Sequence, residues 1–448
     1  MSWVDDRNAA LLTDLYELTM AASYHAHGMN EPATFDLFVR KLPERRNFLV
    51  ACGLEQALSY LETLRFDDDS IAYLRSLEMF DDGFLSFLGD LRFTGDVHAV
   101  AEGEIVFDRE PLLRVTAPMI EAQIVETFLL NGVTFQTMIA SKAARVALAA
   151  RGRDFVDFSP RRDHAADAAI KAARAAYVGG AAATSNVLAG RLYGIPVNGT
   201  MAHSYVMAFE DERTAFRTFA RDFPDRAVLL IDTFDVEEGA RIAADVAREL
   251  AAEGSRLRGV RIDSGELGEL ARAVRKILDY EGLHDVRIVV SGDLDEVRVA
   301  GLIDDGAPVD AFGVGTQLGT SADAPTLGGV YKLVSDAHGP KMKFSAGKAT
   351  LPGRKQVFRT TAGGRLHHDV IALEDEPVDG EPLLHPVMAN GRRTAPPEGL
   401  DAIRTRCRAG LERLPERLRV LDPATEPYPV TLSPRLDALV AAMERGAS

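Results

Sequence analysis

The chain contains few cysteines, no long apolar run and fewer basic than acidic residues. Only Cys52 and Cys407 are cysteines, and they form no CxxC pair. Two such residues cannot build a disulfide framework or provide metal-ligand spacing, and they fit a reducing cytosol. No stretch approaches the roughly 20 apolar residues of a membrane-spanning helix, and the first residues, MSWVDDRNAALL, do not resemble a signal peptide. We therefore expect a cytoplasmic protein with no membrane partner.

The charge balance excludes one class of partner. The 51 Lys and Arg residues face 67 Asp and Glu residues, which gives a formal net charge of −16. Because this field repels nucleic acid, we expect no nucleic-acid binding. An anionic ligand must then be held by a local group of basic side chains and backbone amides. The length of 448 residues favours two or three domains with an ample core.

One pattern recurs between residues 154 and 321: a short apolar run ends abruptly in small, polar or charged residues. The runs are DFVDFSPRR at 154–162, PVNGTMAHS at 196–204, LLIDTFD at 229–235, GVRIDSGE at 259–266, RIVVSGD at 287–293 and DAFGVGTQLGTS at 310–321. Amphipathic stretches separate several of them, as buried parallel strands alternating with helices would require. The pattern predicts a βα barrel or a doubly wound sheet, in which chemistry gathers at the carboxyl ends of the strands.

The flanking segments follow other patterns. Residues 8–27 have a helical apolar face, 93–116 alternate like short antiparallel strands, and the pattern changes after about 335, where the segment 331–359 alternates and is basic. We therefore predict an N-terminal α+β domain over 1–130, a βα barrel catalytic domain over 131–335, and a C-terminal segment over 336–448. The predicted fold class is α/β, an irregular βα barrel packed against an α+β domain built from the N- and C-terminal segments.

A glycine-rich turn follows the last of the apolar runs and contains Gly313, Gly315 and Thr316. Glycine allows close approach of the backbone, and successive amides, or those of a following helix, can hold a phosphate. Most glycine pairs of this kind form only tight turns. The position at the end of a late barrel strand, where phosphate sites recur, favours phosphate binding here.

Acidic residues follow three successive strands. They are Asp232 and Asp235, then Asp263, then Asp293 and Asp295. Carboxylates at one edge of a sheet could orient sugar hydroxyls, bind Mg²⁺ or stabilise developing positive charge. An aspartate in such a loop can instead cap the next helix, and we prefer that interpretation for Asp235 and Asp295. Asp263 and Asp293, each beside a Ser–Gly pair, are the functional candidates.

Two basic side chains accompany these aspartates. Arg261 lies two residues before Asp263 and points the same way along its strand. An arginine that points into a barrel needs a carboxylate or phosphate partner. His203 could act as a general base, contact a phosphate or attack one, and the pattern does not choose among these roles.

Other basic residues are scattered along the chain: Arg40, Arg161, Arg162, Lys332, Lys341, Lys343 and Lys348. Charged side chains are normally just solvated, and Lys341 fits that description. Lys332, Lys343 and Lys348, however, share one segment shortly after the glycine-rich turn. A bound diphosphate would need such donors.

Together these motifs resemble the nicotinate phosphoribosyltransferase family, type II phosphoribosyltransferases of NAD synthesis and salvage. The resemblance covers essentially the whole chain. It rests on Leu12-Thr13-Asp14-Leu15-Tyr16 and on the segments 35–40, 157–162, 199–204, 261–265, 291–293, 312–316 and 331–334. It implies a barrel of the type II phosphoribosyltransferase kind.

The resemblance implies a reaction of nicotinate with 5-phosphoribosyl 1-diphosphate that yields nicotinate mononucleotide and diphosphate. It implies coupling to ATP hydrolysis through a transient phosphohistidine, which matches His203. Mg²⁺ would be held mainly by the diphosphate, with no dedicated protein cage. Members form homodimers with shared active sites.

The same resemblance implies roles for individual residues. Arg261 and Asp263 would lie beside the reacting centre. Tyr16 and Phe158 would sandwich the pyridine ring, with Tyr16 coming from a second subunit. The residues that would hold the phosphoribosyl group and its phosphates are Gly292, Asp293, Gly313, Gly315, Thr316, Arg40, Lys332, Lys343 and Lys348, the basic ones across the subunit interface.

The choice of pyridine rests on the segment Thr184-Ser185-Asn186. Nicotinamide-using relatives place an aspartate there, which would repel nicotinate, whereas Ser185 can donate to a carboxylate. Arg161 or Arg162 could complete the carboxylate clamp.

Three alternative functions are to be considered. A nicotinamide- or quinolinate-using phosphoribosyltransferase of the same fold is the nearest of them. A non-catalytic nucleotide-binding relative should have lost Asp263, Asp293 or His203, and all three are present. A sugar-phosphate lyase or isomerase would need a Schiff-base lysine or a buried glutamate at a strand end, and we find neither at the six predicted strand ends.

Overall fold

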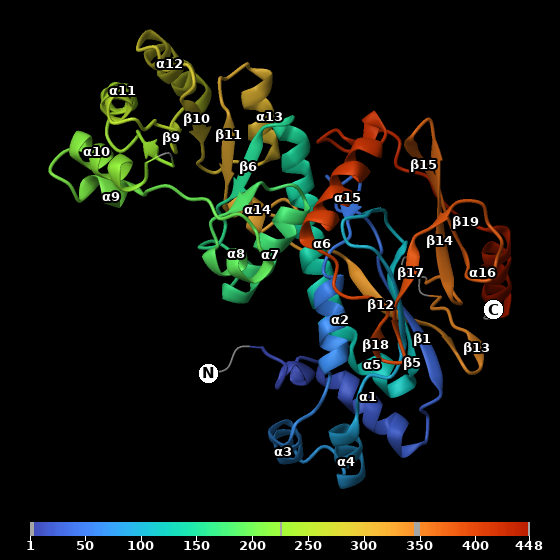
Figure 1. The fold of residues 1–448 in the computed structure, drawn as a ribbon. Coiled ribbons are helices and arrows are strands. Elements are labelled where there is room, and N and C mark those ends of the chain that lie inside the picture. The colour runs from blue at the N-terminus through green and yellow to red at the C-terminus, as the bar shows by residue number, and fades with distance from the viewer. Residues whose placement is uncertain (1–3, 225, 345–349, 447–448) are drawn as a thin grey trace. The chain divides into compact units, whose positions relative to one another are not determined.

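The computed structural model describes residues 4–224, 226–344 and 350–446. The chain divides into two compact units, one formed by residues 1–141 and 326–448 and the other by residues 142–325. Figure 1 shows the fold, with its elements labelled where there is room. Within the described ranges, no helix is both long and apolar enough to cross a membrane.

The unit at 142–325 contains a parallel sheet of six strands. They are β6 (Asp154–Asp157), β7 (Ala183–Thr184), β8 (Val228–Leu230), β9 (Gly259–Ile262), β10 (Arg287–Val290) and β11 (Ala311–Val314). Their order is β7-β6-β11-β10-β9-β8, and every pairing is parallel. This is the circular order of a βα barrel opened between β7 and β8. It confirms the predicted α/β fold class and brings the carboxyl ends of all six strands to one edge.

Helices follow most of these strands, as the amphipathic stretches predict. They are α7 (Ala166–Val178), α8 (Val187–Tyr193), α9 (His203–Met207), α10 (Glu212–Asp222), α11 (Val236–Ala252), α12 (Leu267–Tyr280), α13 (Glu296–Asp304) and α14 (Thr316–Gly319). Asp235 caps α11 by accepting from the Glu238 amide at 2.9 Å, and Asp295 caps α13 by accepting from the Arg298 amide at 2.8 Å. Both capping predictions are confirmed.

One of the six apolar runs does not form the strand that its pattern predicts. The run at 196–204 contributes only an isolated parallel bridge between Val197 and Thr184. The strand at this place is β7, whose sequence is a two-residue Ala-Thr pair. So short a strand leaves no apolar run from which it could be recognised.

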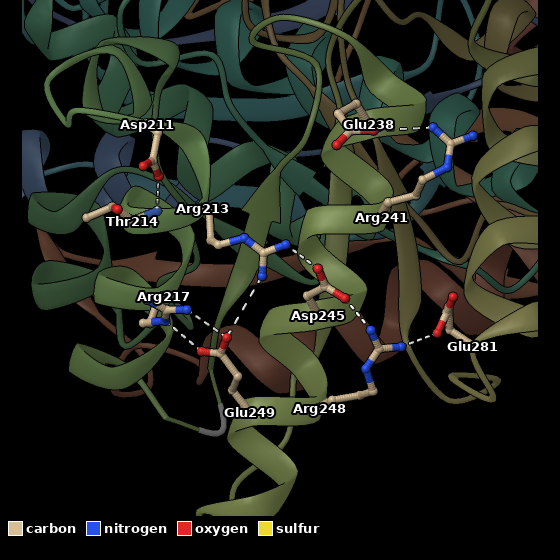
Figure 2. Close-up of polar contacts among 10 residues, drawn as sticks. All are labelled: Asp211, Arg213, Thr214, Arg217, Glu238, Arg241, Asp245, Arg248, Glu249 and Glu281. Atoms are coloured by element: carbon tan, nitrogen blue, oxygen red, sulfur yellow. Dashed lines mark hydrogen bonds and ion pairs between the residues drawn. The ribbon is translucent and has the colours of Figure 1, made fainter.

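Ion pairs join the helices α10, α11 and α12 along their exposed sides. Figure 2 shows Arg213 and Arg217 of α10 pointing toward Asp245 and Glu249 of α11. Arg248 of α11 pairs in turn with Glu281, which follows α12. Because the pairs are spaced four residues apart on both α10 and α11, they match one side of each helix to the other.

The other unit contains mainly antiparallel sheets. Its seven-stranded sheet has the order β13-β12-β1-β5-β3-β17-β18, and a four-stranded sheet has the order β16-β14-β15-β19. The strands are β1 (Pro32–Val39), β2 (Leu49–Val50), β3 (Asp96–Val100), β4 (Ile105–Val106), β5 (Pro111–Pro118), β12 (Gly329–Asp336), β13 (Gly339–Pro340), β14 (Lys355–Ala362), β15 (Arg365–Leu373), β16 (Glu381–Pro382), β17 (Leu384–Ala389), β18 (Arg392–Arg393) and β19 (Val430–Leu432). Since β1 pairs with both β5 and β12, the N-terminal and C-terminal segments share one sheet.

The helices of this unit come from both ends of the chain. They are η1 (Ala9–Leu11), α1 (Leu15–Ala26), α2 (Leu54–Thr63), α3 (Asp68–Ser76), α4 (Asp82–Asp90), α5 (Met119–Ile124), the first part of α6 (Glu126–Ala150), α15 (Leu400–Arg413), η2 (Glu416–Leu418) and α16 (Pro434–Gly446). A large apolar core includes Leu37 and Val115 on two neighbouring strands and Leu61 on α2.

Candidate active site

Arg261 joins three chain segments at the carboxyl edge of the parallel sheet. Its guanidinium donates to Asp263 Oδ1 at 3.0 Å, to Ser291 Oγ at 3.0 Å and to the Met201 carbonyl at 2.7 Å. Burial lowers the pKa of the guanidinium, whereas the carboxylates of Asp263 and Asp232 act to raise it. Its Nε is buried and has no hydrogen-bond partner among the described residues. The charge of Arg261 is therefore held in place by the tips of β9 and β10.

Asp232 holds the loop that carries Asp263. Its Oδ2 accepts from the Asp263 amide at 2.9 Å and from Ser264 Oγ at 2.7 Å. Its Oδ1 is buried, and no described residue donates to it. The Asp263 side chain is 34% exposed and accepts from Ser291 Oγ through Oδ1. Asp263 thus has one carboxylate oxygen fixed by the protein and the other directed toward His203.

His203 is the first residue of α9, and its side chain is 38% exposed. Its Nδ1 lies 3.2 Å from Thr233 Oγ1, and its Nε2 lies 3.9 Å from Asp263 Oδ2. If Nδ1 carries the hydrogen and donates it to Thr233, Nε2 has a free lone pair. The arrangement therefore suits an imidazole that attacks or deprotonates through Nε2.

The tip of β10 has an unusual backbone. Gly292 has φ +103° and Asp293 has φ +46°, so two successive residues lie in the left-handed region. A Cβ at Gly292 would lie 2.0 Å from the Asp263 carbonyl oxygen, which explains the glycine there. A left-handed aspartate costs about 1–3 kcal/mol, and such strain clusters at functional sites. It presents the exposed Asp293 at the edge of the sheet beside Asp263.

Phe158 and Gly313 fit against each other. A Cβ at Gly313 would lie 2.5 Å from two carbons of the Phe158 ring, and the Phe158 amide donates to the Val314 carbonyl at 2.8 Å. Gly313 is therefore required by the aromatic ring, whatever else its backbone binds. Gly315 and Thr316 lie at the start of the short helix α14.

Arg161 and Ser185 follow neighbouring strands. Arg161, after β6, is exposed, and Ser185, after β7, is half-buried. The positive charge of Arg161 contributes to the lowered pKa of Arg261. The parallel sheet thus brings Arg161, Ser185, Phe158, Arg261, Asp263 and His203 to one edge, together with the tips that carry Asp293 and the glycine-rich turn.

The remaining predicted residues belong to the unit formed by 1–141 and 326–448. Tyr16, 47% exposed, and Lys332 both line a cavity of about 390 Å³ together with Phe35 and Tyr331. Lys332 pairs with Glu126 at 3.3 Å. The pKa of Tyr16 is raised, first by burial and then by Glu126.

The other basic candidates of this unit differ in their exposure to solvent. The Arg40 Nε is buried, and no described residue accepts from it. Lys343 is exposed. Lys348 lies outside the described residues.

The sequence assigned no specific role to two residues of the site. Ser291 contacts both Arg261 and Asp263, and Thr233 contacts His203. Ser291 belongs to the Ser-Gly-Asp motif and Thr233 follows Asp232, so both lie next to residues that the sequence pattern singles out. Their roles come from contacts across the sheet, which a single sequence does not reveal.

The sequence of the chain is similar to that of known proteins along most of its length. The nicotinate phosphoribosyltransferase N-terminal domain matches residues 11–134, the nicotinate phosphoribosyltransferase family matches 154–337, and the C-terminal domain matches 377–440. Nicotinate phosphoribosyltransferase pncB2 of Mycobacterium tuberculosis is 49% identical over 432 residues, which cover 95% of this chain and 92% of that protein. The nicotinate phosphoribosyltransferase of Bacillus subtilis is 44% identical over 397 residues, covering 85% and 80%.

A solved structure agrees with these sequence matches. The crystal structure of human nicotinic acid phosphoribosyltransferase superposes with a TM-score of 0.86 at 31% identity, over 96% of this chain and 99% of that chain. Sequence and fold therefore agree along nearly the whole length, and the chain belongs to the nicotinate phosphoribosyltransferase family.

Proposed function

We propose that this chain transfers the phosphoribosyl group of 5-phosphoribosyl 1-diphosphate to nicotinate, forming nicotinate mononucleotide and diphosphate for NAD biosynthesis. The observation that carries the proposal is the convergence of Arg261, Asp263 and His203 at one sheet edge, in a chain of this family. The alternative pyridine substrate, nicotinamide, is disfavoured because Thr184-Ser185-Asn186 contains no carboxylate.

The chemistry requires charge stabilisation more than a nucleophilic side chain. The bond between the ribosyl carbon and the diphosphate breaks, the diphosphate keeps the electron pair, and the pyridine nitrogen forms the new bond. Positive charge develops on the ribose meanwhile, and the partly exposed carboxylate of Asp263 is suited to stabilise it. Arg261, whose guanidinium lies at the same sheet edge, is suited to the opposite charge on the leaving diphosphate.

The substrate contacts follow from the same edge. Phe158 would stack on the pyridine ring, while Ser185 and Arg161 would donate to its carboxylate. Asp293, with Gly292, would accept from the ribose hydroxyls. Gly313, Gly315 and Thr316 would hold the 5-phosphate with their amides.

ATP would be coupled to this transfer through His203. Its Nε2 would attack the γ-phosphorus of ATP, the bond to the bridging oxygen would break, and ADP would leave with the electron pair. Water would later hydrolyse the phosphohistidine, releasing phosphate and restoring the imidazole. The contact between Nδ1 and Thr233 Oγ1 supports this step, because Nε2 keeps its lone pair when Nδ1 is the donor of that hydrogen bond.

Mg²⁺ is the cofactor that this chemistry calls for. Among the described residues, no three His, Cys, Asp or Glu side chains are grouped to hold a metal. Mg²⁺ commonly binds one or two carboxylates together with substrate phosphates, and Asp263 and Asp232, whose Oδ1 accepts from none of the described residues, fit that requirement. When bound, Mg²⁺ would neutralise charge on the leaving diphosphate.

We further infer a homodimer with shared active sites. Tyr16 of a second copy would complete the pyridine sandwich, and Arg40, Lys332, Lys343 and Lys348 would contact phosphates across the interface. A cytoplasmic location remains the prediction made from composition.

The proposal is tested by measuring mononucleotide formation from phosphoribosyl diphosphate and Mg²⁺, with nicotinate or nicotinamide, and with or without ATP. We expect turnover of nicotinate, stimulation by ATP, and loss of that stimulation in His203→Ala. The exposed His284 provides a matched control. His284→Ala also removes an imidazole of the same unit, but His284 precedes the start of β10 and is not at a carboxyl end of the sheet. Preference for nicotinamide would contradict the assigned role of Ser185, and ATP stimulation that survives in His203→Ala would contradict the phosphohistidine.

A further inference from the structure

A single buried carboxylate joins the tips of β6 and β7. Asp157, the last residue of β6, is 0% exposed. Its Oδ1 accepts from the Ser159 amide at 2.9 Å, and its Oδ2 accepts from Thr184 Oγ1 at 2.8 Å. Ser159 and Thr184 are each 1% exposed. We call these three residues the Asp157 link.

The backbone reinforces the link from both sides. The Ser185 amide donates to the Asp157 carbonyl at 2.9 Å. The Asn186 amide donates to Thr184 Oγ1 at 3.0 Å, so this hydroxyl both donates and accepts. The Asp157 side chain therefore adds to the backbone pairing of β6 and β7 in fixing the positions of the two tips.

Buried and partly exposed residues alternate along both tips. Asp157 and Ser159 are buried on either side of the half-buried Phe158, and the buried Thr184 precedes the half-buried Ser185. Successive side chains of an extended chain point in opposite directions. The Asp157 link consequently lies behind the two residues that the proposed function assigns to the pyridine ring and to its carboxylate.

We propose that Asp157 is a positioning residue that fixes the spacing between Phe158 and Ser185 and so selects a pyridine carboxylate as the acceptor. The inference rests on the proposed function, which assigns Phe158 and Ser185 to nicotinate. Asp157 itself is fully buried and acts only through its neighbours.

The chemistry of the link explains why the residue is an aspartate. Two donors approach two different oxygens, and only a carboxylate presents two acceptors at this length. Burial raises the pKa of Asp157, while the hydrogen bonds from Ser159 and Thr184 act to lower it. The Ser159 amide can only donate, so an asparagine at 157 would turn its carbonyl oxygen toward it. The NH2 group of that asparagine would then face the Thr184 hydroxyl, which now donates to a carboxylate oxygen. An alanine would leave both buried donors without their acceptor.

The experiment is steady-state kinetics of the full chain, with nicotinate and phosphoribosyl diphosphate varied in turn. The variants are Asp157→Asn, Asp157→Ala and Thr184→Val, and the control is Asp154→Asn at the exposed start of the same strand. Because misplacing a contact by about 1 Å can cost up to roughly 100-fold, we expect the KM for nicotinate to rise about tenfold or more in Asp157→Ala. Asp157→Asn and Thr184→Val should fall between Asp157→Ala and wild type.

The KM for phosphoribosyl diphosphate should rise less than the KM for nicotinate in these variants, because Asp293, among its assigned residues, belongs to the tip of another strand, although Gly313 packs on the Phe158 ring. The preference for nicotinate over nicotinamide, as a ratio of kcat/KM values, should fall with the rising KM. A purely structural role would instead lower kcat and leave both KM values and this ratio unchanged, and that result would overturn the inference.

Two controls keep the outcomes separate. Thr184→Val removes only a hydroxyl, so it decides the question if Asp157→Ala does not fold. Wild-type protein without nicotinate turnover would refute the proposed function itself. Normal wild-type turnover with an unchanged nicotinate KM in Thr184→Val would refute only the positioning role of Asp157.

Discussion

Replacing Lys142 with methionine should destabilise the unit at 142–325 more than most single substitutions. Lys142 and Glu296 are each 2% exposed, and the lysine Nζ contacts Glu296 Oε2 and lies 2.8 Å from Asp323 Oδ1. Burial acts to raise the pKa of Glu296, but Lys142 and Arg145 outweigh it, and the net pKa is lowered. The carboxylate is therefore ionised at neutral pH and depends on its cations.

The magnitude follows from what the substitution leaves behind. Breaking a buried ion pair by removing one partner costs about 3–5 kcal/mol. Arg145 still donates to Glu296 Oε1 at 2.9 Å, so we take the lower end, about 3 kcal/mol. For a unit of this size, that corresponds to a fall of about 6–12 °C in Tm.

The assay is thermal unfolding of wild type, Lys142→Met, Glu296→Gln and the double variant, followed by circular dichroism. The double variant should be more stable than the sum of the two single losses predicts, because it removes the Lys142 cation and the Glu296 carboxylate together, so neither is left buried without the other. A loss below about 1 kcal/mol in Lys142→Met would refute the reasoning, because ion pairs exposed to solvent typically contribute that much or less to stability. Strictly additive losses would also refute it.

Three further predictions concern other parts of the chain. Gly292→Ala should reduce kcat/KM by about 100-fold, because its Cβ would displace the Asp263 backbone, and kinetics with a circular-dichroism check of folding tests this. Arg217→Ala should leave the midpoint of urea unfolding nearly unchanged, because its pair with Glu249 at 2.6 Å is exposed to solvent; a clear fall in the midpoint would contradict this expectation for the pairs shown in Figure 2. Burial raises the pKa of Glu17 to about 7 from 4.5, so its contribution to stability is complete below pH 4.5 and is lost as the pH rises through about 7. The unfolding free energy of Glu17→Gln should accordingly decline less than that of wild type between pH 5 and pH 8, and parallel curves would contradict this.

The regular parts of the fold could be predicted from the sequence because each is encoded locally. The runs at 229–235, 259–266 and 287–293 are apolar and short, and they coincide with the strands β8, β9 and β10. The aspartate caps of α11 and α13 were predicted for the same reason. β7 was missed because two residues carry no periodicity, and its place in the sheet depends on its partner β6.

The site was predicted to a lesser extent because hydrogen bonds between tips are not local. Arg261 was expected to need an anionic partner, and Asp263 is that partner. The glycine at 313 was interpreted as a phosphate-binding feature, yet the Phe158 ring already requires it. A glycine-rich sequence cannot distinguish space left for a ligand from space filled by a neighbouring side chain. The phosphate role of Gly313 stays a prediction.

Two buried charged residues support the strand tips without touching a ligand: Asp157, which is an acid, and Lys142, which is a base. Asp157 joins β6 to β7, on the side assigned to the pyridine. Lys142 holds Glu296, which follows the β10 tip, and Asp323, which follows the glycine-rich turn. Because the two groups share none of these partners, substitutions in them should act separately: Asp157 on nicotinate, and Lys142 on phosphoribosyl diphosphate. A site with its supports divided in this way can change its preference for the pyridine without losing its hold on the phosphoribosyl group.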